Sequence, residues 1–486
     1  MKIPKEVNLI NEKLKKAKFE AYVVGGCVRD LLLNQKPKDW DITTNARPEK
    51  IQKLFPKTFY ENKFGTVTVI TNSKDKTLKT IEITPFRLEG KYSDKRHPDE
   101  IKFAKTVEED LARRDFTVNA IALSSKLKTQ NSKLILIDPF DGQKDIKARI
   151  IRTVGKAEER FNEDALRMLR AVRFACTLDF TIEEKTFKAV QKNAGWIQAI
   201  SKERVKDELI KIFESEKAAE GVDLLRQTNL LKYILPELEK GVGVSQNKHH
   251  IYDIYEHSLR SLKVAVEKKF ALEIRFAALF HDIGKPETKE GEGPDSTFYN
   301  HDYVGAKFTY RILQRLKFSN KFIAKVVLLV RNHMFVSDPQ RLTAAGARRL
   351  VARVGRENIS DLINLRIADR LGMGRPKERP YRLRTIEYMI EKVSKDPISA
   401  KMLKIDGNNV MKLLKIQPGP KVGAILDVLL AEIIEDPKKN DKKYLEKRTE
   451  ELDKEDLEKL RELAKGKIEE KKEEEDLKIR EKYWIK

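Results

Sequence analysis

The chain contains few cysteines: Cys27 and Cys176 are the only two among 486 residues, so no framework of disulfides can hold it together. Both have apolar neighbours, which indicates buried thiols and a reducing compartment. No apolar run approaches the roughly 18 to 20 residues that a membrane-spanning helix needs. The charged amphipathic segment that follows Met1 does not have the pattern of a signal peptide. These absences favour a cytoplasmic protein without a membrane partner.

Basic residues outnumber acidic residues in this chain. The chain has 99 Lys and Arg against 76 Asp and Glu, a net charge of +23. This excess favours polyanionic partners such as RNA or DNA, although a basic surface without any specific partner would have the same composition. The length allows several domains, each with its own core.

Two patterns divide the chain. Residues 1–150 mix strand-like runs with helical periodicity, and we expect strands at 20–24, 39–43, 66–71, 79–84 and 134–137. From about residue 151 onward, the 3.6-residue apolar periodicity predicts helices. The expected fold class is therefore α+β. Its expected domains are a head over 1–150, helical segments over 151–240, 241–340 and 341–436, and a Lys/Glu-rich extension over 437–486, helical or partly disordered.

A glycine pair, Gly25-Gly26, follows the first predicted strand, and two aspartates, Asp39 and Asp41, occupy the next one. Residues two apart in a strand point to the same face, so both carboxylates would enter one volume. Such crowding is unfavourable unless cations bind there. Oxygen ligands suit Mg²⁺, and paired ions of this kind serve nucleotidyl transfer. The glycines would let the backbone approach a triphosphate.

Each of these pieces is weak alone, because an isolated D-x-D also fits a solvated strand edge and an isolated G-G fits a turn. The ordered combination is more specific. It resembles the head of the nucleotidyltransferase superfamily that includes DNA polymerase β and the tRNA CCA-adding enzymes. Glu82, on the strand predicted at 79–84, is either an exposed strand residue or a third member of the acidic cluster.

A second polar segment runs from Asp110 to Ala120 and precedes a predicted apolar helix. Its arginines are good phosphate ligands, and Asp115 could accept ribose hydroxyls. The same residues could instead form a helix N-cap with surface arginines.

Farther along, Asp164, Arg167 and Arg170 have i, i+3, i+6 spacing, close to one face of a helix. An accepting aspartate and a donating arginine can address the edge of a base. The alternative is a weak surface ion pair.

Four segments carry a closer resemblance: Arg113 to Ala120, Asp138 to Gly142, Phe161 to Ala175, and Ser201 to Leu209. Together, and in this order, they resemble the class II tRNA nucleotidyltransferases and bacterial poly(A) polymerases. The resemblance implies a polymerase-β-like nucleotidyltransferase head, an all-helical neck, and addition of C, C and A to the 3′ end of tRNA from CTP and ATP.

The resemblance also implies roles for individual residues. The metal and catalytic positions would be Asp39, Asp41 and Glu82, with Mg²⁺. The nucleotide-binding positions would be Gly25, Gly26, Arg29, Arg114, Asp115, Asn119, Asp164, Arg167, Arg170 and Arg173. Among these, Asp164 and Arg167 would select the base as a protein template.

Three alternatives remain at this stage. Poly(A) polymerases of this family carry a basic G-R-R-F-like stretch where this chain has Lys63 to Val67, which favours CCA addition. CC-adding members tend to lack an intact flexible loop, whereas the loop from Arg87 to Arg96 looks complete; a specialist that adds only A stays open. The third alternative is a hydrolase whose head only binds nucleotide or RNA.

Histidine is scarce as well, and six of the seven histidines lie between residues 249 and 333. Any one of them alone would more often be a core or surface residue than a ligand. The pattern H…HD…H…H…D resembles the HD phosphohydrolase domain. The ligands it implies are His257, His281, Asp282, His301, His333 and Asp369. Imidazole and carboxylate together suit a transition metal such as Mn, Ni, Zn or Fe. The implied activity is hydrolysis of phosphate esters at RNA ends, with Lys285 near the phosphate; His249 and His250 have no predicted role.

Eleven arginines lie on predicted helical segments between Arg341 and Arg384. They fit a surface that follows RNA phosphates, or simply a solvated helix face. The extension over 437–486 has no clear apolar stripe, so its sequence does not indicate what it does.

Overall fold

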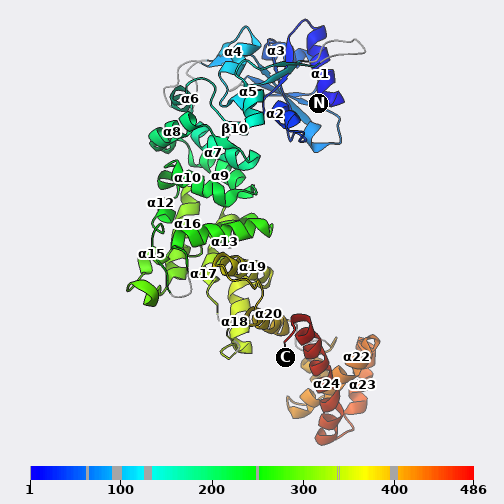
Figure 1. Ribbon diagram of the computed structural model, residues 1–486. Helices are drawn as coiled ribbons and strands as arrows, with labels where there is room; N and C mark the ends of the chain where they lie inside the picture. The colour runs from blue at the N-terminus through cyan, green and yellow to red at the C-terminus, as the bar shows by residue number, and fades with distance from the viewer. Residues whose placement is uncertain are drawn as a thin grey trace. The chain divides into compact units, whose positions relative to one another are not determined.

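The computed structural model describes residues 2–61, 65–89, 101–124, 134–247, 251–335, 338, 340–394 and 403–485. They form two compact units, Met1–Arg331 with Asn364–Gly374, and Asn332–Ile363 with Arg375–Lys486. The first unit carries a mixed sheet followed by helices, and the second is helical, so the α+β prediction is confirmed (Figure 1). Within the described ranges, no helix is long and apolar enough to cross a membrane.

The sheet of the head has the order β3-β4-β5-β2-β1-β8-β9. Its strands are β1 (Ala21–Val24), β2 (Asp41–Thr44), β3 (Thr58–Glu61), β4 (Thr66–Ile70), β5 (Thr80–Pro85), β8 (Ala122–Ser124) and β9 (Ile135–Ile137). The central strand β2 pairs antiparallel with β1 and parallel with β5. All five predicted strands are present, each shifted or shortened by one or two residues.

Two local predictions in the head are wrong. Strand β2 begins at Asp41, and Asp39 lies in the bend before it, so the two aspartates do not share a strand face. The segment after Asn119 continues into β8 instead of an apolar helix. A short apolar run buried between β1 and β9 cannot be distinguished from a helix by periodicity.

Helices cover the sheet and continue into the neck. The helices of the head are α1 (Lys5–Lys16), α2 (Gly26–Leu32), α3 (Pro48–Leu54), α4 (Val107–Ala112) and α5 (Gly142–Ala148). The neck contains α6 (Ala157–Glu163), α7 (Leu166–Leu178), α8 (Glu184–Asn193), α9 (Lys202–Glu214), α10 (Ala218–Gln227), α11 (Leu231–Ile234) and α12 (Pro236–Glu239). Outside the main sheet are the short strands β6 (Arg87–Glu89), β7 (Ile101–Phe103), β10 (Ile150–Ile151) and β11 (Thr181–Ile182).

The histidine-rich segment packs directly on the neck. It contains α13 (Ile254–Glu267), α14 (Leu272–Phe280), α15 (Lys285–Thr288), α16 (His301–Arg315) and α17 (Asn320–Asn332), and α19 (Arg356–Gly372) returns to it. Phe213 of α9 stacks on Phe276 of α14 with ring centroids 3.8 Å apart. Arg275 also donates to the main-chain oxygen of Phe213 over 2.7 Å. These contacts explain why neck and histidine-rich helices form one unit.

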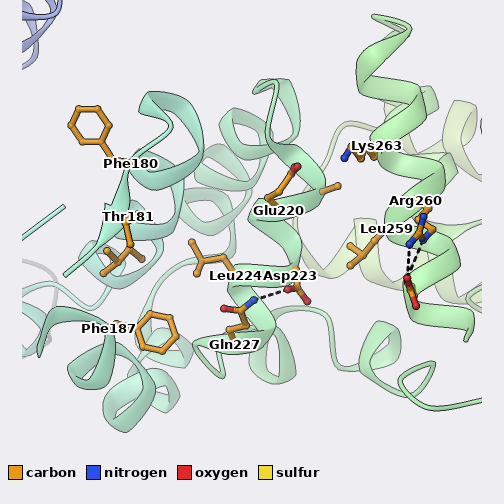
Figure 2. A pocket seen from close by; sticks show the side chains of 13 residues that line it. Phe180, Thr181, Phe187, Glu220, Asp223, Leu224, Gln227, Leu259, Arg260 and Lys263 are labelled. Carbon is orange, nitrogen blue, oxygen red and sulfur yellow. Dashed lines mark hydrogen bonds and ion pairs between the residues drawn. The ribbon is translucent and has the colours of Figure 1, made fainter. Parts of the chain in front are cut away.

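A cavity of about 620 Å³ lies between β11, α8, α10 and α13 of this unit. Figure 2 shows Phe180, Phe187 and Leu224 on its apolar lining, with Glu220 and Lys263 among the charged residues. None of the predicted site residues lines this cavity, so it is separate from both predicted centres.

The second unit has its own apolar core. Its helices are α18 (Ala344–Val354), α20 (Tyr381–Ser394), α21 (Gly407–Leu414), α22 (Pro420–Glu435), α23 (Lys442–Leu452) and α24 (Leu457–Tyr483). Leu445, Leu452 and Leu460 are buried together with Ile425 and Leu429 of α22. The segment over 437–486 is therefore helical where it is described, and it supplies core side chains. Its apolar stripe is hard to see because the buried positions are few and widely spaced.

Candidate functional site

The turn between β1 and α2 brings three predicted residues together. Gly25 has φ of +84°, a conformation that favours glycine. A Cβ at this position would lie 2.8 Å from Nη1 of Arg114 and 3.8 Å from Oδ2 of Asp41. The backbone, the guanidinium and the carboxylate therefore meet at one point, and a side chain at residue 25 would block it.

Three carboxylates gather beside this turn. Asp41 and Glu82 are direct partners in the register of the parallel strands β2 and β5, and Asp39 lies in the bend two residues before β2 begins. The pKa of Asp41 is raised to about 7, first by burial and then by the negative charge of Asp39; Arg114 opposes the shift and Glu82 adds to it. Carboxylates crowded in this way fit a divalent cation, which would offset their repulsion.

Arg114 lies beside the acidic cluster, next to Gly25. Its Nη1 is 3.5 Å from the main-chain oxygen of Asn119, and its Nη2 is 3.5 Å from Oδ2 of Asp110. Its Nε is buried and has no hydrogen-bond partner among the described residues. A buried donor without a partner is costly, and a phosphate oxygen would satisfy it.

A chain of hydrogen bonds links α2 to α7. Arg29 donates from Nη1 to Oδ1 of Asn119 over 2.6 Å, and the amide of Asn119 donates to Asp115 over 3.4 Å. Arg170 donates from Nε to the other oxygen of Asp115 over 2.8 Å. Burial works against the charge on Asp115, but Arg170 and Arg167 outweigh it and lower the pKa of Asp115 to about 2. These predicted nucleotide-binding residues thus form one connected network.

Asp164 does not lie on the predicted helix face. It has an extended backbone (φ of −140°) between α6 and α7, which begins at Leu166. Its Oδ1 accepts a hydrogen bond from the main-chain nitrogen of Leu166 at 3.0 Å. Its Oδ2 accepts one from Nη2 of Arg204 on α9, at 2.7 Å. No role is predicted for Arg204 from the sequence, although it lies in the segment from Ser201 to Leu209 that carries part of the resemblance.

The arginines of α7 also have partners within the protein. Arg167 donates to Glu163 and to the main-chain oxygen of Arg113, the latter over 3.2 Å. Arg173 donates to Glu208 of α9 over 2.8 Å and lies 3.5 Å from the ring centroid of Phe174. The head, α7 and α9 are thus connected at the predicted nucleotide pocket.

A second cluster lies in the histidine-rich helices. His257 comes from α13, His281 and Asp282 follow α14, His301 opens α16, and Asp369 lies on the part of α19 that belongs to the same unit. Nε2 of His257 is 3.1 Å from Nε2 of His281 and 3.2 Å from Oδ1 of Asp369. All five side chains are buried. His257, His281 and Asp282 lie close enough together to hold one metal ion.

The main chain orients two of these imidazoles. Nδ1 of His281 is 2.8 Å from the oxygen of Ala278, and Nδ1 of His301 is 2.7 Å from the oxygen of Phe298. A proton on each Nδ1 leaves the Nε2 lone pair directed toward the cluster, as metal ligation requires.

Charges within the cluster favour ionised groups. Burial opposes protonation of His281, but the carboxylate of Asp282 outweighs it and raises the pKa of His281. Burial likewise opposes the charge on Asp369, whereas Arg366 and the two histidines hold the pKa of Asp369 well below its usual value. Lys285 donates to Oδ2 of Asp282 and to Oε1 of Gln246, both over 2.6 Å. These neighbouring opposite charges fit a site for cations and phosphate esters.

Two glycines permit the close packing that forms this cluster. A Cβ on Gly284 would lie 2.3 Å from the main-chain oxygen of His301, and one on Gly372 would lie 2.5 Å from Oγ of Ser261. The first contact brings α15 against α16, and the second brings α19 against α13. These helices carry three of the predicted ligands, His257, His301 and Asp369.

The remaining predicted residues are His333, those outside the described ranges, and the arginines of the 341–384 segment. His333 is buried and directly follows α17; it belongs to the second unit, and its place among the ligands stays a prediction. Lys63, Phe64 and residues 90–96 of the predicted loop lie outside the described residues, as do His249 and His250. Exposed arginines of the 341–384 segment include Arg348, Arg349, Arg353 and Arg356.

Three models of known protein families match successive parts of the chain. The model described as the Poly A polymerase head domain matches residues 21–152, and the one described as the probable RNA and SrmB-binding site of polymerase A matches 179–241. The HD domain model matches 254–374, a range that includes Asp369.

Several characterised proteins are similar to this chain. The A-adding tRNA nucleotidyltransferase of Deinococcus radiodurans is 37% identical over 345 residues, which covers 68% of this chain and 76% of that protein. The CCA-adding enzyme of Ligilactobacillus salivarius is 45% identical over 225 residues, 46% of this chain and 53% of that enzyme, so the match spans about half its length. The crystal structure of the Bacillus stearothermophilus CCA-adding enzyme in complex with CTP is 30% identical with a TM-score of 0.60, covering 93% of this chain and 98% of that one.

Proposed function

The chain belongs to the family of tRNA nucleotidyltransferases that includes the CCA-adding enzymes, and on that basis we propose that it adds C, C and A to the 3′ end of tRNA from CTP and ATP. No nucleic-acid template is needed in this proposal, because the protein selects each base. The observation that carries the proposal is the cluster of three carboxylates at the turn where Gly25, Arg114 and Asp41 meet.

In this reaction the 3′-hydroxyl of the tRNA attacks the α-phosphate of CTP, twice, and then that of ATP, and pyrophosphate leaves each time. Asp39 and Asp41 would hold Mg²⁺, with Glu82 completing the acidic cluster. Bound there, the metal ions would activate the hydroxyl and stabilise the leaving group.

The remaining side chains of the pocket would bind and orient the nucleotide. Gly25 and Gly26 leave the backbone open to the triphosphate, and Arg29 and Arg114 would neutralise its charge. Asp115 would accept a hydrogen bond from a hydroxyl of the ribose. The amide of Asn119, which donates to Asp115, helps to hold that carboxylate in place.

Base selection would come from the neck. Asp164 accepts hydrogen bonds and Arg167 donates them, so together they can match the edges of cytosine and adenine. Arg170 and Arg173 would line the same pocket.

Incubation with a labelled tRNA that lacks CCA tests this proposal. CTP alone should add two C, and ATP alone should give no productive addition. Both nucleotides together should add CCA. Addition of a single A, only to tRNA that already ends in CC, would identify an A-adding specialist. Long A-tails would identify a poly(A) polymerase.

A second activity is favoured by the buried cluster around His281 and Asp282. We propose that it holds a transition metal (Mn, Ni, Zn or Fe) and hydrolyses phosphate esters at RNA ends, with His333 as a further ligand and Lys285 near the phosphate. Metal at this site would supply a hydroxide nucleophile. The test is release of phosphate from RNA ends, or opening of a 2′,3′-cyclic phosphate. Activity that depends on Asp282 but not on Asp41 would support this second proposal. If only a head-dependent activity is found, the second proposal is wrong and the first is unaffected.

The tRNA itself would be held by basic surface. Exposed arginines at and near α18, such as Arg348, Arg349 and Arg353, support this assignment because they can follow a phosphate backbone. Such binding would depend on shape and salt more than on sequence.

A further inference from the structure

Helix α16 presents an outer face that neither proposed activity uses. Tyr303, Lys307, Tyr310, Arg311 and Gln314 are all exposed, and their i, i+4, i+7, i+8, i+11 spacing places them on one side of the helix. We refer to these five residues as the α16 stripe. His301, at the start of the same helix, points inward to the buried cluster, with Nε2 3.5 Å from Oδ1 of Asp282.

Exposed tyrosine is concentrated here. Of the four tyrosines that are exposed among the described residues, three are Tyr299, Tyr303 and Tyr310, with 71%, 48% and 48% of their surface accessible. Tyr299 is two residues from His301. Several exposed rings close in sequence to a predicted ligand of the cluster are unusual for a surface that only meets water, because aromatic side chains gain free energy when they are covered.

Cations accompany these rings. Nζ of Lys307 lies 4.4 Å from the ring centroid of Tyr303, and the guanidinium carbon of Arg331 on α17 lies 5.5 Å from it. Arg311, next to Tyr310, has no ion-pair or hydrogen-bond partner in the part of the chain that the structure describes. The nearest acid on α16, Asp302, forms an ion pair with Arg331. The stripe is therefore aromatic and positive, with no acid of its own.

The geometry points to the α16 stripe as a binding surface for single-stranded RNA, which leads toward the buried cluster at the N-terminal end of the helix. Unpaired bases would stack on Tyr303 and Tyr310, and Lys307 and Arg311 would contact the phosphates between them. Tyr299 would receive the nucleotide nearest His301. This inference extends the proposed hydrolytic activity, because it names single-stranded RNA ends as the substrate class of that site.

Binding is best measured without catalysis. Full-length protein is titrated into a 5′-fluorescein-labelled 12-nucleotide RNA with EDTA present, and fluorescence anisotropy is compared with that of the matching duplex. The test variants are Tyr303→Ala/Tyr310→Ala and Lys307→Ala/Arg311→Ala. The matched controls are Phe59→Ala, an exposed aromatic on β3, and Lys263→Ala/Lys268→Ala, exposed lysines on α13 and at its C-terminal cap.

We expect the tyrosine variant to bind the single strand at least about tenfold more weakly, with little change for the duplex. The Lys307→Ala/Arg311→Ala variant should weaken binding and make the slope of log K against log[salt] shallower by about 0.7 for each cation removed. The control variants should stay within about twofold of the unaltered protein.

Other results overturn the inference. The tyrosine variant could bind the single strand as well as the unaltered protein does, or it could lose affinity equally for single strand and duplex. Either result would show that the stripe acts only as a positively charged surface and does not stack on unpaired bases. Unchanged RNA binding together with altered mass by light scattering would assign the stripe to a protein contact. Failure of the proposed hydrolysis is detected separately, because Asp282→Asn should abolish phosphate release and leave single-strand binding intact.

Discussion

Arg204 donates a hydrogen bond from Nη2 to Oδ2 of Asp164 over 2.7 Å, although the two residues are 40 positions apart in the chain. Its Nη1 lies 3.4 Å from the other oxygen. The pair fixes the rotation of the Asp164 carboxylate. If Asp164 reads the base edge as proposed, Arg204 sets the orientation in which it does so.

We therefore predict that Arg204→Gln lowers nucleotide discrimination. One good base contact is worth about 1–3 kcal/mol, so the ratio of kcat/KM for CTP to that for UTP should fall by roughly 5- to 150-fold. Arg204→Lys keeps the charge but not the two-pronged contact, and should recover part of the ratio. If overall activity falls while the CTP/UTP ratio is unchanged, Arg204 only supports the fold.

The sequence was most informative where chemistry is carried by short ordered motifs. Gly25 and Asp41 are predicted to meet from the order of the glycine pair and the aspartate strand, Glu82 has two open interpretations, and the family resemblance implies the role of Arg114. The structure places Gly25, Asp41 and Arg114 at one turn, with Glu82 beside Asp41. Asp39 reaches the same cluster from a bend, which an i, i+2 argument about strands could not foresee.

Partners that come from distant elements were not predictable. The contact of Asp164 with Arg204 depends on how α7 packs on α9, and the contact of Gly284 with His301 depends on how α15 packs on α16. Neither packing has a signal in local periodicity. The core role of Leu445 and Leu460 was missed for the same reason, since each contributes to an interface with another helix and not to a continuous stripe.

Replacing one metal-site carboxylate should separate the two proposed activities. We predict that Asp41→Asn reduces nucleotide addition by more than the roughly 100-fold seen when residues that merely support a metal ligand are changed. Phosphate release at the second cluster should remain, because Asp282 and His281 are untouched. The surface change Asp75→Asn serves as a control for addition. Loss of both activities in Asp41→Asn would contradict two separable sites.

The packing of α15 on α16 gives a prediction about the second cluster. In Gly284→Ala, the new Cβ would meet the main-chain oxygen of His301 at 2.3 Å, so α16 must move and take His301 away from Asp282. Overpacking of this kind costs about 1–3 kcal/mol of stability. Phosphate release should fall more than nucleotide addition does.

Gly423 provides the matched control for that experiment. A Cβ there meets no atom within 4 Å, and the residue is in the first turn of α22. Gly423→Ala should therefore stabilise the protein slightly, by about 0.5–1 kcal/mol, and leave phosphate release unchanged. A Gly284→Ala protein with full phosphate release would show that the ligands do not depend on this contact.

Acid should weaken the head through Asp115. Its pKa of about 2 in the folded protein lies below the ordinary value of 3.8, because Arg170 and Arg167 outweigh the effect of burial. A lowered carboxyl pKa stabilises the fold above the unfolded value, and the stabilisation is lost as the pH falls from about 4 toward 2. The difference corresponds to about 2 kcal/mol. Urea unfolding followed by tryptophan fluorescence should show a steeper loss of stability in this window for the unaltered protein than for Asp115→Asn.

Asp75 provides the comparison that tests the cause. Its pKa is also lowered to about 2, first by its hydrogen bond with Lys36, but this pair lies at the surface. Salt screens exposed pairs far more than buried ones, so 0.5 M NaCl should remove the pH dependence that depends on Asp75 and leave that of Asp115 largely intact. If salt removed both equally, the Asp115–Arg170 pair would be open to solvent and could not hold in place the carboxylate that we propose binds the ribose.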